Sequence, residues 1–224
     1  MPGRMNIKLN SDADLKALLR EIGFIPLFES DACPGCSVEA LTIGQWWTGR
    51  SDDPWHWRET LSEDEEILYG KFFSGRAGFI TKEWLPKFAN YRRDGYDFDS
   101  LEEEGLAAKK LSDVMEVVER EGRILSNTLK KAAGAKGYEG AVTALQMKMY
   151  LFIDGFGRRV DKSGRPYGWS IAYLSKPENR YGYDFTAGEY CKKPEISYRE
   201  ILSHALKVFP YAEEDALSRL ISVR

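Results

Sequence analysis

The segment from Ala107 to Tyr173 constrains the fold of this 224-residue chain more than any other part. Apolar residues recur at helical spacing in AAKKLSDVMEVVEREG, and Gly122 ends that helix. A short helix with Ser126 as its predicted N-cap follows, and the compact turn AAGAKGYE leads into a longer third helix. Two strands about a polar turn complete the segment. This order predicts a winged helix-turn-helix.

In such a unit the third helix enters the major groove of DNA and basic hairpin residues contact phosphates. A helical wheel turns Val142, Leu145 and Met149 toward the core. The residues that it turns outward or to the flanks are Thr143, Gln146, Met147, Lys148 and Tyr150. The predicted DNA-binding residues are Thr143, Gln146, Lys148, Arg158, Arg159, Lys162 and Arg165.

The charges of the chain are unevenly distributed around a net charge of −3. Residues 122–165 carry nine Lys or Arg and three acids, whereas residues 1–121 carry 15 Lys or Arg and 24 acids. A basic block attracts an anionic polymer, although it can also be an ordinary solvated face. Residues 71–95 form a second basic island. A second basic surface is therefore predicted from Lys82, Lys87, Arg92 and Arg93.

The flanking residues predict an α+β fold. SDADLKALLREIG indicates a helix from Ser11 to Gly23, ILYGKFF and AGFIT indicate strands, and KEWLPKFANYRR indicates a helix. TIGQWWTGRSDDPWHW holds four of the six Trp, which we interpret as core packing. Two C-terminal helices are expected, with Ser197 as N-cap of the first and Pro210 between them. The expected organisation is an N-terminal α/β region at 1–105, a winged-helix domain at 106–176 and a helical extension at 177–224 that packs on it.

Composition and motifs narrow the function classes. The N-terminus has no apolar signal segment, no apolar run is long enough to span a bilayer, and three cysteines form no disulfide pattern, so we expect a cytoplasmic protein without membrane contact. The CPGC stretch, Cys33 to Cys36, has the spacing of a redox or zinc pair. Only Cys191, His56 and His204 are available to complete a ligand set, and their spacing supports none. We therefore predict no metal and no cofactor.

Two stretches, AGFITKEWLPKFANYRR and the hairpin at residues 151–159, resemble parts of the AlkZ-type winged-helix DNA glycosylases. The stretch AGFITKEWLPKFANYRR is similar to one that precedes a winged helix in that family, and the matching residues are Ala77, Phe79, Glu83, Pro86 and Phe88. Residues 151–159 resemble the family's hairpin in kind. The resemblance covers residues 15–174 at low identity, in a chain shorter than the family's usual three tandem winged helices. It implies a DNA-binding protein with a role in DNA repair.

The same resemblance gives a second meaning to LLREIGFIPLF, residues 18–28. The family ends an early helix with an L-G-L-L-Q-Φ-Q/D-like motif, whose two polar residues position water for cleavage of the N-glycosidic bond. When Gly23 is aligned with the glycine of that motif, Pro26, Leu27 and Phe28 fall on the catalytic triplet. Pro and Phe have no group that could orient or deprotonate water. The resemblance therefore implies that the family's catalytic pair is absent.

Three hypotheses follow from these patterns. We favour a protein related to the AlkZ-type glycosylases that binds double-stranded DNA without standard glycosylase activity. The first alternative is a glycosylase acting on alkylated or crosslinked bases through other carboxylates, for which Glu83, Asp94 and Asp97 are the candidates. The second is a winged-helix protein-interaction module, which a third helix buried against other elements would favour. The C-terminal helices also offer a surface for a homodimer.

Overall fold

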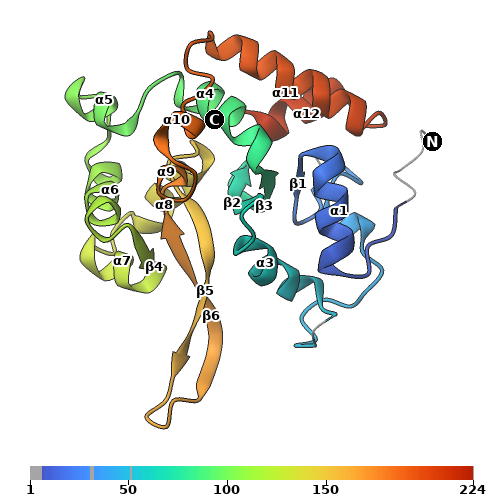
Figure 1. Cartoon of the computed structure of the whole chain (residues 1–224), viewed down its shortest axis with the longest axis horizontal. Coiled ribbons are helices and arrows are strands. Elements are labelled where there is room, and N and C mark those ends of the chain that lie inside the picture. Colours follow the sequence, from blue (N-terminus) through green and yellow to red (C-terminus); the bar gives the residue numbers. More distant parts are fainter. Residues whose placement is uncertain (1–6, 31–32, 51, 224) are drawn as a thin grey trace.

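One antiparallel sheet runs through the molecule (Figure 1). The computed structural model describes residues 7–30, 33–50 and 52–223, and of the side chains of Arg159 and Val160 nothing is described. The strands are β1 (Phe24–Pro26), β2 (Ile67–Phe73), β3 (Arg76–Thr81), β4 (Arg123–Leu125), β5 (Phe152–Val160) and β6 (Pro166–Ser175). Their order across the sheet is β1-β3-β2-β5-β6-β4, and each neighbouring pair is antiparallel. The predicted α+β class is confirmed.

Helices pack against this sheet. They are α1 (Asp12–Ile22), α2 (Val38–Leu41), α3 (Pro54–Ser62), the 3₁₀ turn η1 (Lys82–Trp84), α4 (Leu85–Arg93), α5 (Phe98–Glu103), α6 (Lys109–Glu121), α7 (Ser126–Ala132), α8 (Tyr138–Met147), α9 (Pro177–Tyr181), α10 (Tyr183–Thr186), α11 (Pro194–Val208) and α12 (Glu214–Ile221). Within the described residues, no helix is long and apolar enough to cross a membrane.

The first helix, α1, folds as its sequence predicts. The Ser11 hydroxyl accepts a hydrogen bond from the Asp14 amide at 3.1 Å and caps α1. The four apolar residues of its stripe are all buried, namely Leu15, Leu18, Leu19 and Ile22. Gly23 ends the helix with a φ of 80°, a conformation that glycine adopts without the penalty of a Cβ. The chain then passes directly into β1.

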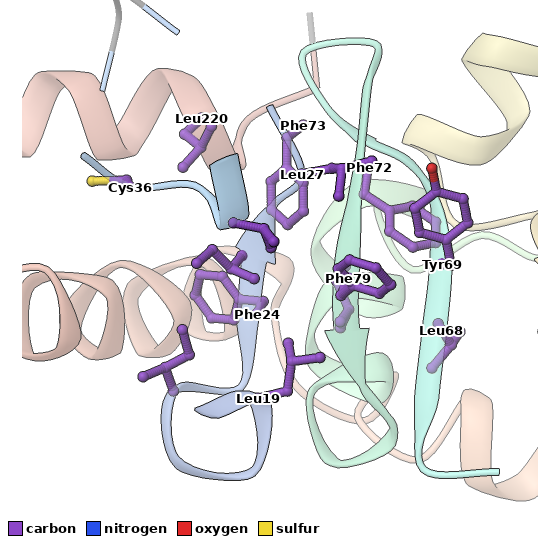
Figure 2. Close-up of a cluster of buried hydrophobic side chains, with 14 of the residues drawn as sticks. Leu19, Phe24, Leu27, Cys36, Leu68, Tyr69, Phe72, Phe73, Phe79 and Leu220 are labelled. Carbon is purple, nitrogen blue, oxygen red and sulfur yellow. The ribbon is translucent and has the colours of Figure 1, made fainter. Parts of the chain in front are cut away.

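The larger core lies between β1, β2, β3 and the helices α1, α4, α11 and α12. Phe24 of β1 meets Phe88 of α4 edge to face, with ring centroids 5.1 Å apart. Figure 2 shows Phe24, Leu27, Phe73 and Phe79 gathered in this cluster. Because all of these side chains are removed from water, the first strand is held from both sides by apolar packing.

A second core lies among α6, α7 and α8. Its members include Val114, Val118, Leu129 and Leu145, all of which are fully buried. The chain order α6–β4–α7–α8–β5–β6 agrees with the predicted sequence of helices and hairpin, and β4 pairs with β6. The helices are where the sequence places them, and this core fixes α8 beside the sheet.

Two of the predicted N-caps are wrong. Ser126 is the first residue of α7, whose N-cap is Leu125, and neither supplies a side-chain cap bond. Ser197 lies inside α11, which begins at Pro194. The Ser197 hydroxyl instead accepts a hydrogen bond from the Asn90 amide group at 2.9 Å and joins α11 to α4. Proline at the start of a helix gives an alternative beginning that the serine pattern does not reveal.

Strands β5 and β6 continue beyond the sheet as a two-stranded arm, the gold and orange hairpin of Figure 1. The register between them shifts twice near the base of the arm, between Ile153 and Phe156 and between Gly157 and Arg159. Gly155 lies within the first irregularity and has a φ of 90°. A β-bulge bends a strand and increases its twist, so the direction of the arm is set near its base.

Gly23→Ala is expected to destabilise the protein more than the matched change Gly122→Ala. Both glycines end helices with positive φ, so each substitution introduces the same backbone strain of about 1–2 kcal/mol. A Cβ at Gly23 would lie 2.3 Å from Nε1 of Trp84, whereas a Cβ at Gly122 meets nothing within 4 Å. Overpacking should therefore add about 1–3 kcal/mol at Gly23 alone. Urea unfolding measures both, and equal losses would contradict the close approach of Trp84.

Candidate nucleic-acid interface

The arm presents the hairpin cations to solvent. Lys162 and Arg165 lie at its tip, and the Arg165 side chain is 80% exposed. Asp161 accepts hydrogen bonds from the hydroxyl and amide of Ser163 and from the amide of Arg165, so the pKa of Asp161 is lowered and its charge partly offsets Arg165. Arg158 lies nearer the base of the arm and is half exposed. The structure thus places three of the four predicted cations on one projection.

The outward face of α8 is covered by β2. Gln146 is only 2% exposed, so the prediction that it faces outward is wrong. Its Oε1 accepts a hydrogen bond from the Lys71 amide at 3.0 Å, and its Nε2 donates to the Val142 carbonyl. Thr143 is half-buried and accepts from Nζ of Lys71 at 3.3 Å. The helical wheel finds the core face but has no information about a strand packed on the opposite side.

The end of α8 also differs from the helical-wheel prediction. The helix stops at Met147, Lys148 is its C-cap, and Met149 has a φ of 64°. Tyr150 is therefore not on the helix and is buried, with its hydroxyl donating to the Tyr96 carbonyl at 2.8 Å. The expectation that Tyr150 faces outward is wrong. Lys148 is partly exposed.

The predicted second basic surface is wrong, because its two arginines are internal and Lys87 is ion-paired. Arg92 is 4% exposed and donates to the carbonyls of Ile221 at 3.0 Å and Met147 at 3.2 Å. Arg93 is 3% exposed and forms an ion pair with Glu178.

The two lysines of that island are also engaged. Lys87 forms ion pairs with Glu200 and with Glu189. Lys82 lies over the ring of Phe185 at 4.9 Å, and the hollow beside it also contains Glu65, Glu66 and Glu83. The positive charge that the sequence concentrates in residues 71–95 therefore does not form a positive surface through these four residues.

The residues aligned with the family's catalytic triplet, Pro26, Leu27 and Phe28, take part in strand pairing and aromatic packing. Pro26 pairs with Gly78 in the sheet, and the Leu27 amide donates to the Ala77 carbonyl at 2.8 Å. Phe28 packs against Trp46 with centroids 5.5 Å apart. A hollow of about 350 Å³ opens beside them, and its described lining is Pro26, Phe28, Ser30, Phe73, Ser74, Arg76, Arg219 and Leu220. Among those residues there is no carboxylate or carboxamide.

The alternative carboxylates do not share a pocket. Glu83 is exposed beside Lys82, and Asp94 is exposed at the left-handed end of α4. Asp97 accepts a hydrogen bond from the Tyr183 hydroxyl at 2.7 Å and lines a different hollow. An acid and a base acting on one bond have to converge, and these three side chains do not line a common hollow.

The cysteines of CPGC are buried and reduced. Cys33 and Cys36 are 3% and 1% exposed, and both belong to the larger core. A hydrogen bond with Cys36 lowers the pKa of Cys33. Within the described residues, no group of three or more His, Cys, Asp or Glu is placed to hold a metal ion.

A hollow lined by tryptophans was missed by the sequence interpretation. It has a volume of about 390 Å³ and lies between the α3 segment and the base of the arm. The aromatic and charged or titratable side chains that line it, apart from Asp53, are Trp47, Trp55, His56, Glu59, Arg158 and Trp169. The core interpretation holds for Trp57, which is 2% exposed, but is wrong for Trp47, which is 58% exposed. We call this site the tryptophan hollow.

Comparison with known protein families supports the resemblance over nearly the whole chain. A family model described as AlkZ related matches residues 9–222. The chain therefore belongs to the AlkZ-related family. No curated protein and no solved structure shows significant similarity to it.

Gln146→Leu should lower the free energy of unfolding by about 1–3 kcal/mol, since the Lys71 amide loses its acceptor within a packed interface. Lys148→Leu, two residues along and partly exposed, is the control and should change stability by no more than about 0.5 kcal/mol. Chemical denaturation measures both variants. Equal stability of the Gln146 variant and the wild type would mean that this face of α8 is not held by β2.

Proposed function

We propose that the protein is a winged-helix protein that binds double-stranded DNA mainly through its β5–β6 arm. The proposal is carried by three exposed cations on one projection, Arg158, Lys162 and Arg165, in a member of the AlkZ-related family. Lys and Arg side chains neutralise phosphates and release counterions, which favours binding independently of sequence. The order α6–β4–α7–α8–β5–β6, with β4 beside β6, supports reading the arm as the wing.

The arm is favoured over α8 as the main contact. Gln146 is bonded within the protein, and Thr143 is bonded to Lys71, so neither is available as it stands to read a base edge. Lys148 keeps partial exposure and remains a proposed phosphate contact. The covering of α8 favours a scaffold role for this helix, in which it orients the arm rather than entering a groove.

We further propose that standard glycosylase chemistry is absent. Pro26 and Phe28, at the aligned positions, offer no acceptor for a proton from water. A glycosylase acting through Glu83, Asp94 and Asp97 is less well supported, because these carboxylates do not line one hollow. The division into 1–105, 106–176 and 177–224, a cytoplasmic location and a homodimer through the C-terminal helices remain predictions from the sequence.

The double variant Lys162→Ala, Arg165→Ala should weaken binding to duplex DNA about equally for all sequences. Losing two phosphate contacts should reduce the slope of log affinity against log salt by about 2, because each contact contributes a slope of about 0.9. Fluorescence anisotropy at several salt concentrations measures this. Arg120→Ala, Arg199→Ala removes the same charge from exposed positions on α6 and α11 and should have little effect. An unchanged slope in the arm variant would refute the arm as the DNA contact.

Incubation with alkylated or crosslinked duplexes should release no bases. Abasic sites, revealed by alkaline cleavage, are the readout, and a glycosylase active on the same substrates is the positive control. Base release above the no-protein level would contradict the proposed absence of standard glycosylase chemistry. It would leave DNA binding by the arm intact, because cleavage itself requires contact with DNA.

A further inference from the structure

We infer that the tryptophan hollow is a binding site for one unpaired nucleobase of DNA held by the arm. The inference rests on the proposed function, because the arm has to hold the flanking phosphates. The hollow has about 390 Å³, toward the lower end of the usual range of about 300–1,000 Å³ for ligand sites. It is therefore suited to one small planar group.

Two of the tryptophans that line the hollow are exposed. Trp47 is 58% exposed and Trp169 is 75% exposed, although they come from segments more than a hundred residues apart in the sequence. A large aromatic ring left in water forfeits the free energy of burial, and two at one hollow mark a surface that a ligand covers. Indole rings stack on any nucleobase, because every base has a π-face.

The loop that carries Trp47 is held in place without a ligand. Trp47 has a φ of 61°, which is rare for a bulky residue and persists only where the surroundings impose it. The carboxylate of Asp53, which is 1% exposed, accepts hydrogen bonds from the amides of Thr48, Gly49 and Trp55. The aromatic wall is thus preorganised, which lowers the ordering cost of binding.

Glu59 supplies a hydrogen-bond acceptor inside the hollow. Its Oε1 accepts from the Ser170 hydroxyl at 2.6 Å and from Nη2 of Arg58 at 3.2 Å. Its Oε2 has no hydrogen bond within the described part of the chain. Nη2 of Arg158 forms an ion pair with Oε2 at 3.9 Å, which is too long for a hydrogen bond.

This carboxylate oxygen, which is ion-paired but accepts no hydrogen bond, selects the class of base. An ionised carboxylate accepts hydrogen bonds and donates none, so it favours bases with an exocyclic amino group. Cytosine, adenine and guanine have one, whereas thymine presents a single N–H between two carbonyl oxygens. The proposed ligand is therefore an unpaired amino-bearing base.

Two arginines lie next to Glu59. Arg58, which is 4% exposed, lies over the rings of Trp55 and Phe156, at 3.8 and 4.2 Å from their centroids, and holds Glu59 through its hydrogen bond to Oε1. Arg158 of β5 also lines the hollow and links it to the arm. A DNA backbone that follows the arm toward its base would reach the hollow with its phosphates already contacted.

The test compares two duplexes that differ only by one bulged dC. Wild-type protein should bind the bulged duplex about 5- to 100-fold more tightly than the paired one, as expected for one stacked base. Trp169→Ala should abolish that preference and leave the affinity for paired DNA nearly unchanged, and Trp169→Phe should keep most of it. Tyr167→Ala is the matched control, because Tyr167 is exposed on the same strand but does not line the hollow. Its preference should equal that of the wild type.

The outcomes separate this site from the arm. Equal affinity of wild-type protein for both duplexes overturns the inference and leaves the proposed function standing. Equal loss of preference in Trp169→Ala and Tyr167→Ala also overturns it, since the hollow would then have no special role. Failure to bind either duplex overturns both. A bulged dT that binds as well as dC in the wild type would overturn the role given to Glu59.

Discussion

Two adjacent buried arginines at the end of α4 hold the parts of this molecule together. Arg92 donates to carbonyls at the ends of α8 and α12, where helices leave such groups without partners. Arg93 reaches Glu178 of α9 and the Tyr190 hydroxyl, at 3.0 Å from the latter. Burying two guanidinium groups carries a large desolvation cost, which only a nearly complete set of partners offsets. The direction in which β5 leaves α8, and hence the position of the arm, depends on these bonds.

That dependence explains where sequence-based prediction succeeds and where it fails. Features decided by neighbours in the chain are predicted correctly, as with the Ser11 cap, the Gly23 stop and the apolar stripe of α1. Arg92 and Arg93 read as surface charge because their partners are carbonyls more than fifty residues away. A count of charges records the sign of a group but not the acceptors that surround it in the fold.

The candidate site follows the same rule. The hairpin cations were predictable, since a polar turn between two strands keeps Lys162 and Arg165 in solvent. The burial of Gln146 was not predictable, because a helical wheel describes one helix alone. It gives no sign that β2 packs on the face of α8 opposite to the core. The tryptophan hollow was missed for a related reason. A cluster of aromatic residues indicates burial, but only the path of the arm brings Trp169 opposite Trp47.

The bulges at the base of the arm fix the direction in which the arm projects. Gly155 lies within the first register shift with a φ of 90°, and a Cβ there would lie 2.9 Å from Nη2 of Arg123. A larger residue at this position would have to displace Arg123, whose guanidinium donates to the carbonyl of Asp154. The direction of the arm is thus encoded in a few uncharged backbone positions. Selection on those positions can therefore change where the arm points while every cation on it stays unchanged.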